Sequence, residues 1–444
     1  VKTIHDYVFV NPSGKYIYPV YGCKTDKVNS FGIAKFIFSA HLFFNILIKN
    51  QKSLHAIDKA TFAHKKNIYI QTSAEALHVD PEKKIVTYNQ KSKNKSISYN
   101  KLIIATGAAP FIPPIPGIDN QNIFTLRALQ DSTKIKDFIN QKKPKKAIII
   151  GGGFIGLEMA EAFHTLHIQT TVLEKAHNVA TTMSTEIGEI IKQELIQNNI
   201  NVITSVDINN IERKNNNSII VKTNKGDFES DFIIVSIGIR PNTSFIKNSE
   251  ISLHETGAIL VDEHSKTNLE DIYAAGDCAT VANIITNKPV YMPLGTTANK
   301  QGRVAGLHAS GITNEKFKGI VGTQLVKVCN LEIAKTGFNQ KDAENRNIPC
   351  KATSVKWKGK AGYWPDTQEL FGTMTIETEN NTIIGCELVG TESAALRINS
   401  AAVAIMNKMK IEDVAYLDLG YAPPFSPVWD IINALAQQLV VRKK

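Results

Sequence analysis

Cysteine is scarce in this sequence of 444 residues. Its five cysteines are widely spaced, and no C-x-x-C pair occurs among Cys23, Cys278, Cys329, Cys350 and Cys386. An odd number of isolated cysteines argues against a disulfide framework and against a thiolate zinc site, so we expect no metal centre. The same usage favours a reducing compartment, and we expect a cytoplasmic protein.

A long hydrophobic run is also missing. The most apolar stretch, residues 31–48, is interrupted by Lys35 and His41. A membrane-spanning helix needs about 20 consecutive apolar residues, which this stretch does not supply. We therefore expect a buried segment here and no association with a membrane.

Acidic residues are outnumbered by basic ones, 41 against 51, which gives a formal net charge of +10. Such an excess can attract nucleic acid. Here most of the lysines are scattered, and the two dense groups, at 91–95 and 142–146, lie in segments that we expect to be loops. We therefore expect no nucleic-acid partner, and attribute the charge to an ordinary solvated surface or to mild steering of anionic substrates.

The clearest motif lies at residues 147–175, AIIIGGGFIGLEMAEAFHTLHIQTTVLEK. An apolar run predicts a buried strand, glycines follow in G-x-G-x-x-G spacing, and helix formers come next. Gly151 would permit the turn, Gly153 would let a pyrophosphate approach the backbone, and Gly156 would let helix and strand pack closely. The pattern predicts a dinucleotide bound at the helix N-terminus, the alternative being a glycine-rich turn without a ligand.

An acidic residue ends the second apolar run of this motif. Glu174 stands eighteen residues after Gly156. A carboxylate there can accept hydrogen bonds from the adenosine ribose and repels a 2′-phosphate. NADH is therefore favoured over NADPH, although the neighbouring Lys175 acts against this preference.

Two similar strand ends flank the dinucleotide motif. In residues 102–110 and 231–242 an apolar strand reaches a small residue and a glycine, with a proline nearby. This repetition suggests two nucleotide-binding domains whose chains cross over twice. Further on, an expected strand delivers Asp277 to its carboxyl end, where it could hold sugar or ribityl hydroxyls or, alternatively, cap a following helix.

The length predicts about three domains. Residues 1–30 show no sustained helical or strand period and no glycine motif. Residues 67–104 read as a small β-rich element with a polar turn at 90–96, and the chain from 322 onward reads as an α+β domain.

Several of these segments resemble one family. They are LIIATGAAPFIPPIPG, IIIGGGFIGLEMAEAF, IIVSIGIRPN, TNLEDIYAAGDCA, TTANKQGRVAG and LGYAPPFSPVWDIIN, in this order. They are similar to motifs of the FAD-dependent pyridine nucleotide-disulfide oxidoreductases, in the branch of coenzyme A disulfide reductase, NADH oxidase and NADH peroxidase. The resemblance covers roughly residues 67–444.

The resemblance implies an α/β fold with two Rossmann-like domains, for FAD and for NAD, and a C-terminal α+β domain that forms a homodimer. The expected segments are 1–114 (FAD, first part), 115–244 (NAD(P)), 245–321 (FAD, second part) and 322–444 (dimerisation). The implied activity passes hydride from NADH, or NADPH, through FAD to coenzyme A disulfide, oxygen or peroxide.

The resemblance also implies roles for single residues. Those expected beside FAD are Thr106, Gly107, Asp277 and Ala298. Those expected at the NAD site are Gly151, Gly153, Gly156, Glu158 near the nicotinamide, Glu174 and Gly238. Tyr363 and Tyr421 match tyrosines that reach the partner subunit's redox centre, the alternative being aromatic packing at the dimer interface.

Two parts of the family pattern are missing. Residues 1–30 hold only Gly14 and Gly22, so the glycine motif for FAD is absent, and SFG at 30–32 is followed by no redox cysteine. Cys23 lies about ten residues early and is the remaining candidate, because Lys24 could lower its pKa. The alternatives to an active enzyme are a degraded member that binds NADH and dimerises, and a non-enzymatic NADH-responsive protein.

Overall fold

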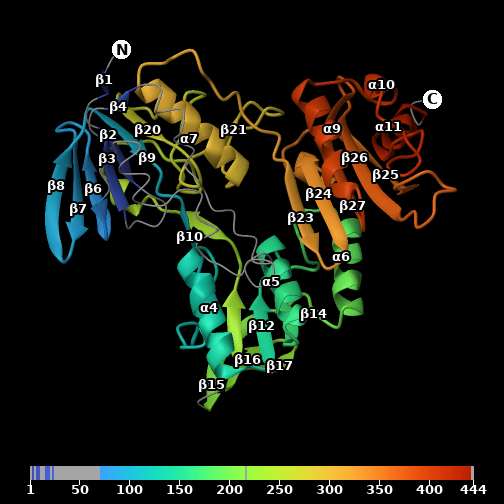
Figure 1. Cartoon of the computed structure of the whole chain (residues 1–444), viewed down its shortest axis with the longest axis horizontal. Helices are drawn as coiled ribbons and strands as arrows, with labels where there is room; N and C mark the ends of the chain where they lie inside the picture. Colours follow the sequence, from blue (N-terminus) through green and yellow to red (C-terminus); the bar gives the residue numbers. More distant parts are fainter. Residues whose placement is uncertain are drawn as a thin grey trace. The chain divides into compact units, whose positions relative to one another are not determined.

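The computed structural model describes residues 3–4, 7–10, 16–20, 23–24, 71–215 and 218–441, and it forms two compact units (Figure 1). The first unit holds the described residues up to Phe111 together with Gly238–Ile320. The second holds Ile112–Ile237 and the chain from Val321 onward. The apolar stretch 31–48 lies outside the described residues. Among the described helices, none combines the length and the apolar character of a membrane span.

A five-stranded sheet lies in the first unit. Strand β9 (Lys101–Ile104) pairs in parallel with β20 (Ile272–Ala274) on one side and with β2 (Tyr7–Val10) on the other. Two antiparallel strands, β3 (Tyr16–Val20) and β5 (Gln71–Thr72), continue the sheet beyond β2. Local periodicity over residues 1–30 did not reveal these strands, because β2 is only four residues long and gains its partner, β9, about ninety residues later.

A separate three-stranded meander precedes β9. Its strands are β6 (Ala74–Asp80), β7 (Ile85–Gln90) and β8 (Lys93–Ser98). The turn between β7 and β8 consists of Lys91 and Ser92, both with positive φ, as in a type I′ hairpin. The polar turn expected within 90–96 is confirmed but is shorter, while the loop expected for most of the 91–95 lysine group is wrong. Strand β8 is exposed along most of its length, so its residues are as polar as those of a loop.

The remaining elements of the first unit are short, apart from one helix. Helix α7 (Gly295–Ala309) packs against β9 and β20. The two similar strand ends of the sequence pair with each other as β10 (Ala108–Pro110) and β19 (Ile239–Pro241). The others are β21 (Val281–Ala282), β22 (Pro289–Val290), the 3₁₀ turn Ser244–Ile246, and the isolated pair β1 (Thr3–Ile4) and β4 (Cys23–Lys24).

The second unit begins with a five-stranded parallel sheet in the order β11-β18-β12-β13-β14. Its strands are β11 (Ile123–Thr125), β12 (Lys146–Ile150), β13 (Gln169–Leu173), β14 (Asn201–Ile203) and β18 (Phe232–Val235). The helices that accompany it are α4 (Leu129–Lys142), α5 (Phe154–Thr165) and α6 (Thr185–Gln197). A meander of β15 (Ile208–Asn215), β16 (Ser218–Thr223) and β17 (Gly226–Ser230) is inserted before β18.

An antiparallel sheet follows, in the order β23-β24-β27-β26-β25. Helix α9 (Ala394–Met406) packs on β24 and β27, and α11 (Ile431–Val441) packs on β25 and β26. The strands are β23 (Gln324–Val328), β24 (Leu331–Gly337), β25 (Cys350–Lys358), β26 (Glu369–Glu377) and β27 (Thr382–Gly390), with short helices α8 (Gln340–Glu344) and α10 (Ile411–Val414). We call the chain from Val321 to Val441 the C-terminal part.

One hydrophobic core joins the parallel sheet to the C-terminal part. Leu157 and Phe163 of α5 belong to the same buried cluster as Val328 and Leu331 of the β23–β24 hairpin. This shared core explains why the two regions form a single compact unit. The division of the chain into four segments remains a prediction.

Candidate functional site: two nucleotide-binding turns and a tyrosine pair

The turn between β12 and α5 has the tight geometry that the glycine spacing predicts. Gly151 has φ +107°, and a Cβ there would lie 2.7 Å from the carbonyl oxygen of Ser236. A Cβ on Gly156 would lie 2.1 Å from the carbonyl oxygen of Gly151. A side chain at either position would therefore push α5 away from the sheet.

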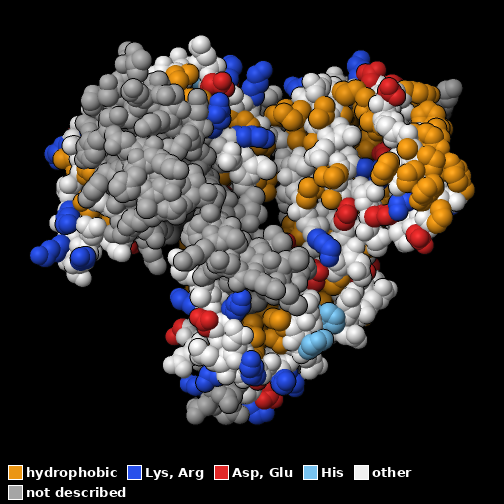
Figure 2. Space-filling model, in the orientation of Figure 1, with side chains coloured by type: hydrophobic (Ala, Val, Ile, Leu, Met, Phe, Trp, Pro, Cys, Tyr) orange, Lys and Arg blue, Asp and Glu red, His pale blue; other side chains and the backbone are white. Residues whose placement is uncertain are grey.

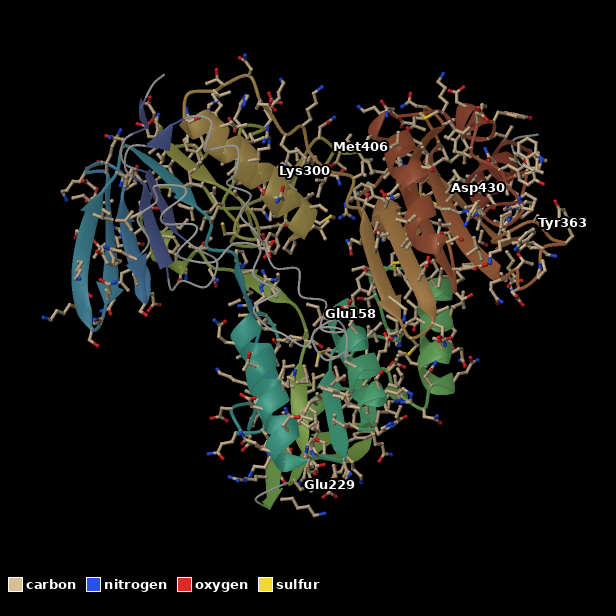
Figure 3. The ribbon with its side chains drawn as sticks, viewed as in Figure 1. Glu158, Glu229, Lys300, Tyr363, Met406 and Asp430 are labelled. Atoms are coloured by element: carbon tan, nitrogen blue, oxygen red, sulfur yellow. The ribbon has the colours of Figure 1, made fainter. Side chains whose placement is uncertain are left out.

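The middle glycine of the motif faces open space. A Cβ on Gly153 would meet no heavy atom of the chain within 4 Å. Gly153 is the N-cap of α5, and no side chain of its own caps the helix there. The partial positive charge of the helix end is therefore available to an anion, and the geometry fits a pyrophosphate. Glu158 lies in the second turn of the same helix and is half-buried (Figure 3).

Glu174 lies at the carboxyl end of β13, beside this turn. Its Oε2 accepts a hydrogen bond of 2.6 Å from the N–H of Gly152, and its Oε1 accepts one of 2.7 Å from the N–H of Ala176. The carboxylate is thus held at the sheet edge where we expect the ribose. Lys175 points elsewhere, because its ammonium pairs at 2.9 Å with the exposed carboxylate of Asp207. This pairing lessens its pull on a 2′-phosphate.

The second group of candidate residues lies in the first unit, at the carboxyl ends of β9 and β20. Thr106 and Asn242 exchange two hydrogen bonds, of 2.7 Å from the Thr106 hydroxyl and 3.0 Å from the Asn242 amide, each to the other's carbonyl oxygen. Gly107 follows with φ +64°, and Gly238, at the start of the partner strand, has φ +113°. The two similar strand ends are therefore fastened together.

Asp277 is buried directly after β20, behind Gly276 with φ +82°. A turn follows it rather than a helix, so the alternative role of a helix cap is wrong. Close by, a Cβ on Gly276 would lie 3.4 Å from the Cβ of Ala298 on α7. The neighbouring Thr297 has a buried hydroxyl with no hydrogen-bond partner in the described part of the chain. Such an atom fits a polar ligand at the start of α7.

These residues fit the flavin and ribityl half of FAD. The fit does not extend to the ADP half, because the strand that lies beside β9 is followed within five residues by antiparallel β3. A crossover to a parallel strand through a helix needs a dozen residues or more. Among the described residues, β2 is therefore followed by β3 and not by the helix N-terminus that would receive the FAD pyrophosphate.

Comparison with protein families gives a match over residues 27–302 to the model described as pyridine nucleotide-disulphide oxidoreductase. The dimerisation domain of the same family matches residues 323–431. The chain belongs to the pyridine nucleotide-disulphide oxidoreductase family. This confirms the expected α/β class and the expectation of an enzyme that uses FAD and NAD(P)H, and it favours the oxidoreductase over a non-catalytic member.

Individual relatives extend over most of the chain. An NAD(P)H sulfur oxidoreductase (CoA-dependent) of Pyrococcus furiosus is 35% identical over 379 residues, which are 85% of this chain and 84% of the relative. A coenzyme A disulfide reductase of Staphylococcus epidermidis is 29% identical and covers 88% of this chain and 87% of its own. The solved structure of an NAD-dependent persulfide reductase from A. fulgidus has a TM-score of 0.87 at 31% identity, over 91% of this chain and 75% of that one.

In this family member, the described cysteine thiols are poor nucleophiles. Burial, followed by the Glu161 carboxylate, raises the pKa of Cys329 to about 12. Burial likewise raises the pKa of Cys278, Cys350 and Cys386. Since the thiolate is the reactive form, none of these four resembles a redox centre. The backbone of Cys23 belongs to β4, but its side chain lies outside the described residues, so its role stays a prediction.

The two tyrosines, far apart in sequence, come together. The hydroxyls of Tyr363 and Tyr421 are 3.2 Å apart, and this hydrogen bond raises the pKa of Tyr421. Both side chains are exposed, and Tyr363 points outward from the C-terminal part (Figure 3).

Sequence analysis missed Arg397, which holds together the loops that carry Tyr363 and Tyr421. The Arg397 guanidinium donates 2.9 Å hydrogen bonds to the carbonyl oxygens of Gly359 and Phe425, one in each loop. It also pairs at 2.6 Å with the buried carboxylate of Asp430. An arginine within the small, apolar helix SAALRINSAAVAIM was the available signal. Among the residues whose side chains the structure describes, no group of metal-binding side chains occurs.

The glycine geometry separates stability from coenzyme binding. Gly156→Ala should lower the free energy of unfolding by about 3 kcal/mol, because its Cβ would overlap a backbone carbonyl oxygen. Gly153→Ala should leave stability within about 0.5 kcal/mol, since its Cβ meets open space, but should weaken NAD⁺ binding about tenfold. Thermal unfolding and calorimetric titration with NAD⁺ measure the two effects. Equal destabilisation by both substitutions would contradict this assignment.

Proposed function

We propose that this oxidoreductase is a homodimer that uses NADH to reduce coenzyme A disulfide. The observation that carries the proposal is the exposed Tyr363–Tyr421 pair, held in place on the C-terminal part by Arg397. Relatives named for coenzyme A-dependent sulfur or disulfide reduction match more than four fifths of the chain, which supports this acceptor.

FAD supplies the two-electron relay between NADH and the disulfide. The turn at Gly151 to Gly156 presents the N-terminus of α5 to the coenzyme pyrophosphate, and Glu174 accepts hydrogen bonds from the ribose. In the first unit, Thr106, Asp277 and Thr297 provide the polar groups for the flavin side. We further propose that FAD belongs to segments 1–114 and 245–321, NAD(P) to 115–244 and the dimer contact to 322–444. The nearby breaks between compact units, at 111/112, 237/238 and 320/321, support these boundaries.

The tyrosine pair can stabilise the thiolate that leaves when a disulfide is reduced. Tyr421 is a neutral hydroxyl at physiological pH, as tyrosines ordinarily are, and its hydrogen bond to Tyr363 raises its pKa further. It can then donate a hydrogen bond, or a proton, to a sulfur that accumulates negative charge when a disulfide breaks. In the homodimer, we propose that this pair serves the redox centre of the partner subunit, with Cys23 as the candidate thiol.

An exposed apolar surface on the C-terminal part supports the homodimer. On α9, Leu396, Val403 and Met406 are all more than half exposed and recur at helical spacing. Tyr416, Phe425 and Val428 are 66–75% exposed in the segments that follow. Hydrophobic side chains cover much of this face (Figure 2). Monomeric proteins rarely expose so large an apolar patch.

Oxygen is a second candidate acceptor. An NADH oxidase of Methanocaldococcus jannaschii is 32% identical over 85% of this chain. The raised pKa of the four described cysteines favours this candidate, since reduction of oxygen by flavin does not require a protein thiol. The scarcity of cysteine, with the four described ones all unpaired, supports a cytoplasmic location.

The visible spectrum of the purified protein tests the function directly. We expect a yellow protein with the visible absorbance band of oxidised flavin. This band should disappear when NADH is added without oxygen, and it should return when coenzyme A disulfide is added. Because residues 1–30 carry no glycine motif for the FAD pyrophosphate, free FAD should be present throughout. Return of the colour with oxygen alone would favour the oxidase, and a protein that stays colourless with added FAD would contradict the proposal.

The role of Cys23 has its own test. Unchanged disulfide turnover in Cys23→Ser would remove Cys23 from the proposed mechanism.

Loss of one tyrosine hydroxyl should affect only the second half of the reaction. Tyr421→Phe should slow coenzyme A disulfide reduction about 100-fold, the range of a lost proton donor, while flavin reduction by NADH keeps its rate. Tyr416→Phe is the matched control, because Tyr416 is also exposed on the C-terminal part but packs edge-to-face against Trp429. Stopped-flow absorbance resolves the two steps. An equal slowing of both steps would contradict the role of Tyr421.

A charge on α9 should separate the subunits. Val403→Lys should give a monomer in analytical ultracentrifugation, because a lysine on an interface helix is costly to bury. Ile196→Lys, at an exposed position on α6, should remain a dimer. A dimeric Val403→Lys variant would show that this face of α9 is not the interface.

A further inference from the structure

Residues 176–184 form a loop that contacts the Gly151–Gly156 turn, where we propose that the coenzyme pyrophosphate binds. The N–H of Ala180 donates a 2.8 Å hydrogen bond to the carbonyl oxygen of Gly152. Val179 is buried against the same glycine, since a Cβ on Gly152 would lie 2.9 Å from Val179 Cγ1. The position of Gly152, and with it the backbone beside the pyrophosphate, therefore depends on where this loop is held.

The far end of the loop is held by the C-terminal part. Glu387 of β27 is fully buried, and its two carboxylate oxygens lie 3.1 and 3.2 Å from the N–H of Ser184, which donates to both. Ser184 is the N-cap of α6, and no side chain of its own caps the helix. Glu387 thus supplies the negative charge that favours a helix N-terminus from a different part of the chain.

Neighbouring side chains complete the environment of this carboxylate. Asn339 donates a 3.0 Å hydrogen bond to Glu387 Oε1, and the Thr373 hydroxyl donates one of 3.2 Å to Oε2. The ammonium of Lys335, itself nearly buried, lies 3.5 Å from Glu387 and 2.6 Å from Asp342. Lys335 also donates to the carbonyl oxygen of Thr182, so a second contact holds the loop.

Such a buried charged group is costly unless every partner is in place. The shared hydrophobic core alone joins the two regions without specifying the loop backbone, because apolar packing has no directional donors or acceptors. Glu387 and Lys335 supply directional contacts. The Glu387 carboxylate accepts from the backbone N–H of Ser184, and the Lys335 ammonium donates to the carbonyl oxygen of Thr182. The loop is thereby fixed in a single position relative to Gly152.

We propose that Glu387, with Lys335 and Asn339, positions the 176–184 loop and so sets the affinity of the NADH site. Glu387 is a positioning residue, since it acts on the coenzyme through Ser184, Ala180 and Gly152. The C-terminal part is then a component of the coenzyme site as well as the dimer surface. The inference rests on NADH binding at the Gly151–Gly156 turn, as in the proposed function.

The test uses the full-length protein with FAD and compares Glu387→Gln with Glu332→Gln. Glu332 is the matched control: it accepts a 2.9 Å hydrogen bond from the N–H of Ala395 in the first turn of α9, within the C-terminal part. Calorimetric titration with NAD⁺ gives the affinity independently of turnover, and steady-state kinetics give KM and kcat for NADH. Glu387→Gln should raise the Kd for NAD⁺ and the KM for NADH about tenfold, with kcat within about twofold.

Each of the following results would overturn the inference. NAD⁺ binding by Glu387→Gln as tight as in the wild type would do so and leave the proposed function standing. Equal weakening in Glu332→Gln would show a general loss of packing. Failure of the wild type to bind NAD⁺ would overturn both the inference and the proposed function. If Glu387→Gln does not fold, Thr373→Val takes its place, because it keeps the shape of the side chain but removes the hydroxyl that donates to Glu387 Oε2. It should weaken NAD⁺ binding in the same direction, and unchanged binding would overturn the inference.

Discussion

The close approach of α5 to β12 at Gly156 is the contact on which the second unit depends. Only a residue without a Cβ allows the helix so near the carbonyl oxygen of Gly151. That approach directs the N-terminus of α5 to the carboxyl edge of the parallel sheet, where Glu174 also lies. The anion site and the ribose acceptor are therefore consequences of one steric requirement.

The C-terminal part belongs to the same compact unit as the parallel sheet that carries the dinucleotide motif. Apolar residues of α5 and of the β23–β24 hairpin share one core, and the buried Glu387 reaches across to the start of α6. The proposed dimer surface and the turn that we propose for NADH consequently belong to one compact unit. Our inference that Glu387 positions the 176–184 loop rests on these contacts, because buried polar contacts tolerate little displacement.

The flavin side shows a different balance. Its ribityl end is well formed, with Asp277 buried and the Thr106 strand end fastened to Asn242. Its other end departs from the family, since β2 lies beside β9 but continues into an antiparallel strand. The described residues thus offer groups for the flavin and ribityl half of FAD.

The sequence by itself determined the parallel-sheet motif and the acidic end of β13, because these follow from local periodicity and from glycine spacing. The order of the family's segments came from the resemblance to that family. The sequence did not reveal β2 and β3, nor that the turn before β8 is only two residues long, since short or exposed strands carry no period that separates them from loops. Only the tertiary structure decided that Tyr363 contacts Tyr421, with Arg397 holding their loops, and that Glu387 accepts a hydrogen bond from Ser184. These contacts join residues dozens to hundreds of positions apart, and such contacts depend on how the chain packs rather than on any local pattern.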